Sequence, residues 1–195
     1  MKIHELFEVK VWTISNVLSL MRVLLTPVLG YTLYLENATQ NEDYKYFACI
    51  IAIIIILTDF LDGYFARLFN QISKLGQFLD PIADKIAAIG VLTFLHFFRD
   101  YPLWIIILII MRDMYSITGA IFLFSKRNIQ VKPNIFGKFM IGAIGVSAFL
   151  YILSPTFNLF GITLQQISIY FILLFLVLST LLYWKTYFKL HLENK

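Results

Sequence analysis

Long apolar segments that recur along the chain constrain its fold more than any other feature. A bilayer core about 30 Å thick requires roughly 20 mostly apolar residues for each helical span. Segments of this length cover residues 17–35, 44–65, 78–97, 102–124, 135–153 and 164–184. Charged residues make up only 14% of the chain, against about 25% in a typical soluble domain. The sequence therefore predicts an all-α integral membrane protein, a bundle of six transmembrane helices.

The rest of the chain adds little beyond these segments. Residues 3–14 alternate loosely between apolar and polar side chains, which predicts a short interfacial helix before the first span. The charges among residues 1–11 are not typical of a cleavable signal peptide. No linker rich in Gly, Ser or Pro and no internal repeat interrupts the sequence, so we expect a single transmembrane domain over residues 1–195.

The distribution of basic residues predicts an orientation. With the N-terminus inside, the inner segments hold most of the Lys and Arg, whereas Lys45 and Arg99 of the outer segments stand beside acidic residues. Because cytoplasmic loops are enriched in Lys and Arg, we expect a multi-pass cell-membrane protein with both termini in the cytoplasm. The net charge of +4 fits contact with anionic membrane lipid. No basic patch with interleaved aromatics indicates a nucleic-acid partner.

Four aspartates stand in or beside the second and third apolar segments, where carboxylates are costly. They are Asp59, Asp62, Asp80 and Asp84. An Asp near the middle of an inserted helix costs about 2.5–3.5 kcal/mol. Spacings of three and four residues place each pair on one face of its helix. A short basic connection joins the two helices, so we expect antiparallel neighbours whose four carboxylates converge.

Converging carboxylates repel one another unless cations intervene. Mg²⁺ prefers oxygen ligands, and two metal ions roughly 4 Å apart commonly assist displacement at phosphorus. The spacing alone leaves two alternatives open. The carboxylates could serve as the ion or proton site of a transporter, or they could form separate ion pairs with Arg67 and Lys85.

The aspartates belong to a longer pattern with fixed spacing. Its eight positions are Asp59, Asp62, Gly63, Ala66, Arg67, Gly76, Asp80 and Asp84. This pattern resembles the signature of the CDP-alcohol phosphotransferase (CDP-alcohol phosphatidyltransferase) family at every position. The resemblance extends to chain length and to the six spans.

The resemblance implies a metal-dependent enzyme of phospholipid biosynthesis that transfers the phosphatidyl group from CDP-diacylglycerol to an alcohol and releases CMP. The implied ligands of two Mg²⁺ or Mn²⁺ ions are Asp59, Asp62, Asp80 and Asp84. Asp84 is also the implied general base for the attacking hydroxyl. The implied contacts to the CDP donor are Gly63, Arg67 and Ser73. The family further implies a homodimer, and the charge pattern places the active site at the cytoplasmic face.

Residues elsewhere in the chain bear on the alcohol. The stretch from Ser15 to Arg22 and the pairs Arg112-Asp113 and Gly137-Lys138 resemble phosphatidylglycerophosphate synthases and the related CDP-dependent cardiolipin synthases. The acceptor of the first group is sn-glycerol 3-phosphate. Positive charge for a phosphorylated acceptor would come from Arg112, Lys132 and Lys138. An Arg inside a span is a functional-site hypothesis by default. The alternative is a local ion pair with Asp113.

Other functions stay open. Arg112-Asp113, where the synthases are expected to have Arg-Glu, is closer to the CDP-dependent cardiolipin synthases, whose acceptor is phosphatidylglycerol. Phosphatidylinositol phosphate synthesis is a third possibility within the family. Outside the family, a cation-coupled transporter and a non-catalytic lipid-binding scaffold are the rival interpretations.

Overall fold

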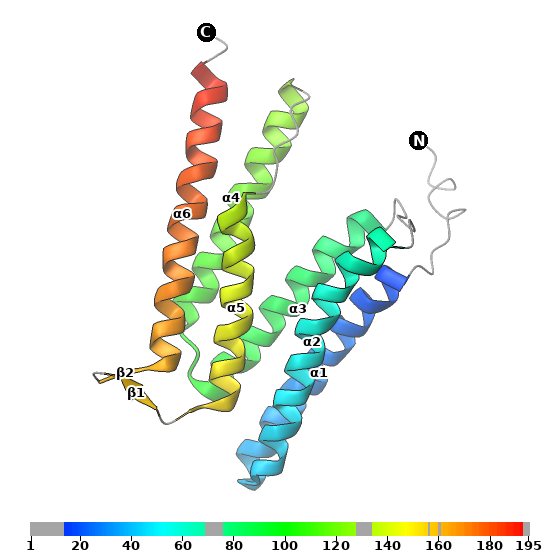
Figure 1. The fold of residues 1–195 in the computed structure, drawn as a ribbon, viewed down its shortest axis with the longest axis vertical. Coiled ribbons are helices and arrows are strands. Elements are labelled where there is room, and N and C mark those ends of the chain that lie inside the picture. The colour runs from blue at the N-terminus through cyan, green and yellow to red at the C-terminus, as the bar shows by residue number, and fades with distance from the viewer. Residues whose placement is uncertain (1–13, 69–75, 128–133, 156, 160, 193–195) are drawn as a thin grey trace. The chain divides into compact units, whose positions relative to one another are not determined.

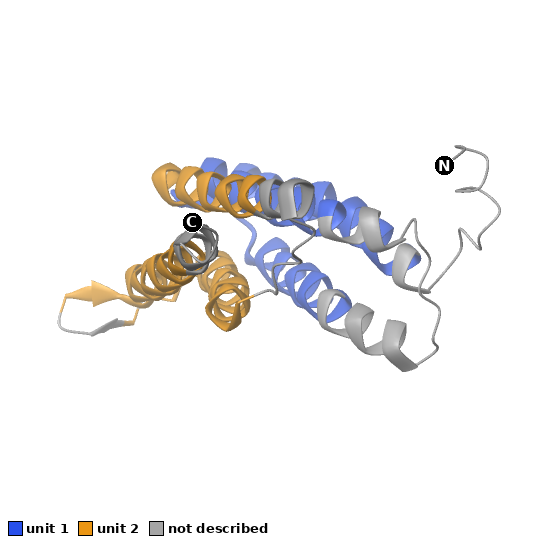
Figure 2. Ribbon diagram, turned by 90° about the horizontal axis from the view of Figure 1, so that it is seen from above, with its two compact units in different colours: residues 1–101 blue, residues 102–195 orange. Residues whose placement is uncertain are grey.

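The chain forms long helices in two compact units. A computed structural model describes residues 14–68, 76–127, 134–155, 157–159 and 161–192 (Figure 1). The units cover residues 1–101 and 102–195 (Figure 2). The first contains α1 (Ile14–Thr39), α2 (Glu42–Leu68) and α3 (Gly76–Arg99). The second contains α4 (Leu103–Arg127), α5 (Ile135–Leu153), β1 (Asn158–Leu159), β2 (Ile162–Thr163) and α6 (Leu164–Leu192).

The six helices within the described ranges correspond to the six predicted segments. Three of them are long and apolar enough to cross a membrane, over Val17–Thr39, Ile135–Leu153 and Leu164–Lys185. The prediction of a helical membrane protein is confirmed to this extent. The short antiparallel hairpin of β1 and β2 was not predicted. The predicted interfacial helix lies, up to residue 13, outside the described residues.

In the first unit, α1 packs against both α2 and α3. Leu29 and Leu33, one turn apart on α1, are completely or almost completely buried. On α2, Ala48 and Ala52 are also one turn apart and buried. Small side chains at such positions let two helix backbones approach closely, which favours association of apolar helices.

Two glycines show how tightly α1 and α3 pack. A Cβ atom added to Gly90 of α3 would lie 2.7 Å from Thr26 Cγ2 of α1. A Cβ atom added to Gly30 of α1 would lie 2.6 Å from the Phe94 ring of α3. Along α1, Thr26 comes before Gly30. Their contact partners on α3, Gly90 and Phe94, follow in the same order. The two helices therefore run in the same direction, as alternate spans of a membrane bundle must.

The Gly90 contact leads to a stability prediction. We expect Gly90→Ala to lower the thermal unfolding temperature of the detergent-solubilised protein, because overpacking costs about 1–3 kcal/mol and Thr26 is stiff at χ1. Gly142→Ala on α5 is the matched control, since a Cβ atom there would meet nothing within 4 Å. The control should be neutral or stabilising, because alanine is favoured over glycine in helices by about 1 kcal/mol. Equal losses in both variants would contradict the tight α1–α3 contact.

In the second unit, α6 packs against α5 and α4. Ser168 Oγ of α6 donates a hydrogen bond of 2.9 Å to Ser147 Oγ of α5, which pairs two hydroxyls in an apolar interface. The first turn of α6 is closed by reciprocal bonds. The Thr163 N–H donates to Gln166 Oε1 at 3.0 Å, and the Gln166 N–H donates to Thr163 Oγ1 at 3.2 Å. This capping box lets the chain pass directly from β2 into α6.

Candidate active site

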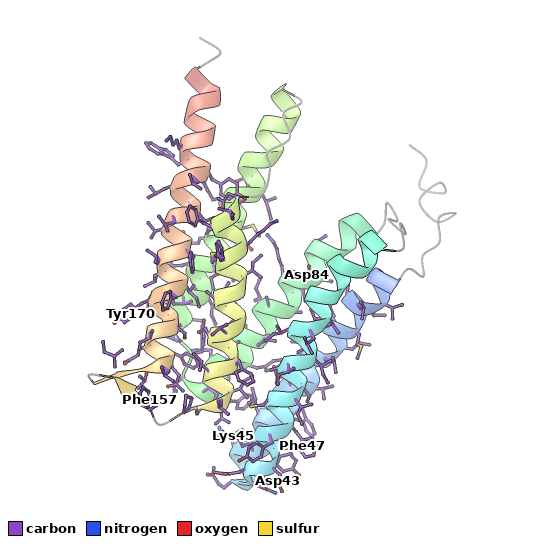
Figure 3. The ribbon with its side chains drawn as sticks, in the orientation of Figure 1. Asp43, Lys45, Phe47, Asp84, Phe157 and Tyr170 are labelled. Atoms are coloured by element: carbon purple, nitrogen blue, oxygen red, sulfur yellow. The ribbon has the colours of Figure 1, made fainter. Side chains whose placement is uncertain are left out.

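Asp84 is the predicted site residue that the structure describes in most detail. It lies on α3 (Figure 3), and its Oδ1 accepts a hydrogen bond from Arg22 Nη1 of α1. The two side chains differ sharply in exposure: Arg22 is 3% exposed, whereas Asp84 is 40% exposed. The carboxylate is therefore accessible to a substrate or an ion, while its cationic partner is enclosed by the helices.

The buried Arg22 belongs to a polar stripe on α1. Ser19 and Thr26, one turn to either side of Arg22, are also buried. Thr26 Oγ1 donates to the Arg22 carbonyl oxygen at 3.0 Å, and the Thr26 methyl group meets α3 at Gly90. This stripe faces α3 and directs Arg22 toward Asp84.

A second ion pair joins the opposite ends of the same two helices. Arg99 Nη2 of α3 donates to Glu36 Oε2 of α1, and both side chains are mostly buried. The partners of the two pairs are 62 and 63 residues apart in sequence. From a helical rise of about 1.5 Å per residue, the pairs stand roughly 20 Å apart along the helix axes. The register of α1 against α3 is thus set at both ends.

The structure places the remaining predicted residues of this site only in part. Asp59, Asp62, Gly63 and Arg67 lie on α2, and Asp80 lies on α3, but their side chains are outside the described residues. Ser73 is also outside them. The predicted convergence of the four carboxylates therefore stays a prediction. Within the described residues, no group of three or more His, Cys, Asp or Glu could hold a metal ion.

Arg112 on α4 lies in a polar cluster of the second unit. Its Nη1 donates to Asp113 Oδ1 at 2.9 Å, and its Nη2 donates to Ser179 Oγ of α6. Its Cζ stands 5.4 Å from the ring centroid of Tyr183, within cation–π range. The ion pair with Asp113, left open as an alternative, is present. The further contacts show that Arg112 also joins α4 to α6.

Asn134 connects this cluster to the start of α5. As the N-cap of α5, its Oδ1 accepts from the Gly137 N–H at 2.6 Å, while its Nδ2 donates to the Ser179 carbonyl at 3.0 Å. A Cβ atom added to Gly137 would lie 2.8 Å from Arg112 Nη2. Glycine at this position therefore leaves room for the guanidinium.

The three residues predicted to bind the acceptor alcohol differ in their exposure and in how far the structure describes them. Arg112 is largely enclosed, with 10% of its side chain exposed. Lys138 on α5 is exposed and follows Gly137 directly. Lys132 lies outside the described residues. We did not predict Asn134 and Ser179 as members of this cluster, although an Asn just before an apolar helix is a recognisable N-cap signal.

Comparison with known protein families decides the classification. Residues 12–184 match the family model of the CDP-alcohol phosphatidyltransferases. The chain belongs to this family. Membership confirms that this CDP-alcohol phosphatidyltransferase is an enzyme, and the transporter interpretation loses its support.

Several curated relatives resemble this CDP-alcohol phosphatidyltransferase. The CDP-diacylglycerol–glycerol-3-phosphate 3-phosphatidyltransferase of Aquifex aeolicus is 39% identical over 129 residues, which cover 65% of this chain and 67% of the relative. The protein of the same name from Bacillus subtilis is 30% identical over 178 residues, which cover 86% of this chain and 91% of the relative. The cardiolipin synthase (CMP-forming) of Homo sapiens is 38% identical over 112 residues, which cover 57% of this chain and 35% of the relative.

Members of the CDP-alcohol phosphatidyltransferase family generally use divalent metal ions. Asp84 fits such a role in donor type, because its carboxylate oxygens are hard ligands of the kind that Mg²⁺ prefers. It also fits in access, because the side chain is 40% exposed. The other proposed ligands, Asp59, Asp62 and Asp80, offer the same donor chemistry in the sequence.

Proposed function

We propose that the protein transfers the phosphatidyl group of CDP-diacylglycerol to sn-glycerol 3-phosphate and produces phosphatidylglycerophosphate and CMP. The observation that carries the proposal is the similarity to the Aquifex and Bacillus enzymes, whose names state this transfer. The family match runs across both compact units, which supports one catalytic domain over residues 1–195.

The aspartates of α2 and α3 provide the chemistry in this proposal. The ligands of two divalent ions, Mg²⁺ or Mn²⁺, are Asp59, Asp62, Asp80 and Asp84. Bound there, the metals would offset negative charge on the phosphates of the donor and of the departing CMP. Asp84 takes the proton from the acceptor hydroxyl while the oxygen of that hydroxyl forms a bond to the phosphatidyl phosphorus. The bond from that phosphorus to the CMP oxygen breaks, and CMP leaves with the electron pair.

The donor and the acceptor are held by different residues. Arg67 and Ser73 contact the diphosphate of the donor, for which the planar fork of an arginine is well suited. Gly63 leaves room for the nucleotide to approach the helix. The phosphate of the acceptor is neutralised by Arg112, Lys132 and Lys138. The contact between Gly137 and the Arg112 guanidinium supports the acceptor site, because it brings the first turn of α5, which carries Lys138, next to Arg112.

The proposed membrane arrangement has six spans, with both termini and the active site at the cytoplasmic face. Alternation of Lys and Arg between loops supports the orientation. The parallel packing of α1 and α3 supports the alternation of the spans. The lipid donor then reaches the site from within the bilayer. We further propose that the enzyme works as a homodimer, as the family resemblance implies.

A second candidate function is cardiolipin synthesis from CDP-diacylglycerol and phosphatidylglycerol. It is favoured by the Arg112–Asp113 pair, which is present as an ion pair of 2.9 Å, and by the similarity to a cardiolipin synthase. The mechanism and the metal site would be the same. Only the acceptor would differ.

The test is release of CMP by the purified protein supplied with CDP-diacylglycerol and Mg²⁺. Glycerol 3-phosphate, phosphatidylglycerol, inositol phosphate and serine are offered in separate reactions. We expect release with glycerol 3-phosphate alone, abolished by EDTA and restored by excess Mg²⁺. Release with phosphatidylglycerol alone would replace the first proposal by the second. Folded protein that releases no CMP with any acceptor would contradict both.

A further inference from the structure

Arg22 is a buried charge that the proposed mechanism does not use. A charged side chain inside a membrane helix is costly and marks a functional site by default. Ion pairing in a low-dielectric setting offsets this cost only when the partners are well placed. The side chain of Arg22 is only 3% exposed, so its charge is almost fully removed from water, whereas its partner Asp84 is 40% exposed. Stability alone is a weak reason for such a pair.

We infer that Arg22 is the positioning residue for Asp84, and that it acts on the transfer reaction by fixing the orientation of this carboxylate. The inference rests on the proposed function, because it gives Arg22 a role in that reaction. A carboxylate has two oxygens. Oδ1 is held by Arg22 Nη1, so the other oxygen has a fixed direction in which to meet a metal ion or the acceptor hydroxyl.

The difference in exposure assigns an indirect role to Arg22. Arg22 is 3% exposed and its partner Asp84 is 40% exposed, so substrate meets the carboxylate and not the guanidinium. Its influence therefore passes through Asp84. This separates Arg22 from Arg67, whose proposed role is direct contact with the donor diphosphate.

Close packing keeps Arg22 in place. Thr26, one turn beyond Arg22, packs against α3, where Gly90 leaves room for the Thr26 methyl group. Sliding of α1 by one turn, about 5.4 Å, would break the Arg22–Asp84 pair and move Thr26 away from Gly90. The arrangement is therefore a rigid support for the base.

The second ion pair also supplies the matched control. Arg99, like Arg22, is a mostly buried arginine that pairs an acidic residue across the α1–α3 interface. It lies at the end of α3 away from the signature. Arg99→Gln should weaken the same helix pair without affecting the orientation of Asp84.

The experiment compares Arg22→Gln, Arg22→Lys and Arg99→Gln by kcat, by KM for both substrates and by thermal unfolding in detergent. Removing a residue that orients a metal-site ligand typically costs about 10- to 100-fold. We expect Arg22→Gln to lower kcat by about 10- to 30-fold, with both KM values changed less than about threefold. Arg22→Lys should recover part of the loss, because it still donates to Oδ1 without the planar fork. Arg99→Gln should lower the unfolding temperature and keep the kcat of the folded enzyme.

A double-mutant cycle tests the coupling without relying on turnover. Arg22→Gln should lower the unfolding temperature less in an Asp84→Asn background than in the wild-type protein, because the two residues interact directly. Additive effects would overturn the inference. So would equal losses of kcat in Arg22→Gln and Arg99→Gln, or a changed KM with unchanged kcat. Wild-type protein that releases no CMP would refute the proposed function, and the cycle would still decide whether Arg22 holds Asp84.

Discussion

Replacing Asp84 by asparagine is expected to reduce CMP release by about 10³-fold or more, since a general base contributes about 10²- to 10⁴-fold and an amide cannot take up the proton. Asparagine has nearly the same shape, and its Oδ1 can still accept from Arg22. The fold and the binding of CDP-diacylglycerol should therefore be largely retained. Turnover of the folded protein and binding of labelled CDP-diacylglycerol in detergent would measure the two effects separately.

Asp43→Asn is the control for this substitution. Asp43 is exposed in the first turn of α2 and lies outside the signature (Figure 3), so its loss should leave turnover unchanged. Transfer at the wild-type rate in Asp84→Asn would refute the assignment of Asp84 as the base. A large drop in unfolding temperature with no change in turnover per folded molecule would instead indicate a purely structural pair with Arg22.

Arg112→Gln is expected to raise the KM for glycerol 3-phosphate by about 100-fold or more, because hydrogen bonds to charged groups contribute about 1.5–3 kcal/mol each and an arginine can form two of them with a phosphate. The KM for CDP-diacylglycerol should change little. Steady-state kinetics with each substrate varied in turn would measure the contrast. Glutamine keeps much of the side-chain length, so the packing of α4 against α6 is disturbed less than by alanine.

Two control variants separate binding from structure in this cluster. Ser179→Ala removes the hydrogen bond to Arg112 Nη2 and keeps the positive charge. Asp113→Asn removes the ion pair and likewise keeps the positive charge of Arg112. Both should affect the KM for glycerol 3-phosphate much less than Arg112→Gln does. If Asp113→Asn matched Arg112→Gln, or if both KM values of Arg112→Gln rose equally, the role of Arg112 would be that of a structural ion pair.

The sequence predicts the helices well because their cause is local. Twenty consecutive apolar residues form a long helix wherever they occur in a membrane protein, since every backbone polar group must be paired within the segment. The bounds of α5, Ile135–Leu153, coincide with the predicted segment. The hairpin of β1 and β2 was missed, because strands of two residues leave no pattern in the sequence.

The pairing of side chains between helices is the part that the sequence does not show. Arg22 and Asp84 are 62 residues apart, and Arg112 and Ser179 are 67 residues apart. Which residues meet depends on how each helix is rotated about its axis. A helix that is apolar on every side carries little periodic signal for that rotation. Arg22 could have been singled out by its charge alone, but its partner could not.

By itself, the sequence predicted the long apolar helices and the family, because apolar length and motif spacing are properties of neighbouring residues. It also singles out the four aspartates as the proposed metal ligands. The tertiary structure decided that α1 packs in parallel with α3, that a buried arginine holds Asp84, and that Arg112 is shared between Asp113 and α6. These contacts depend on close approach at Gly90 and Gly137, where the space of one missing methyl group sets which side chains can meet.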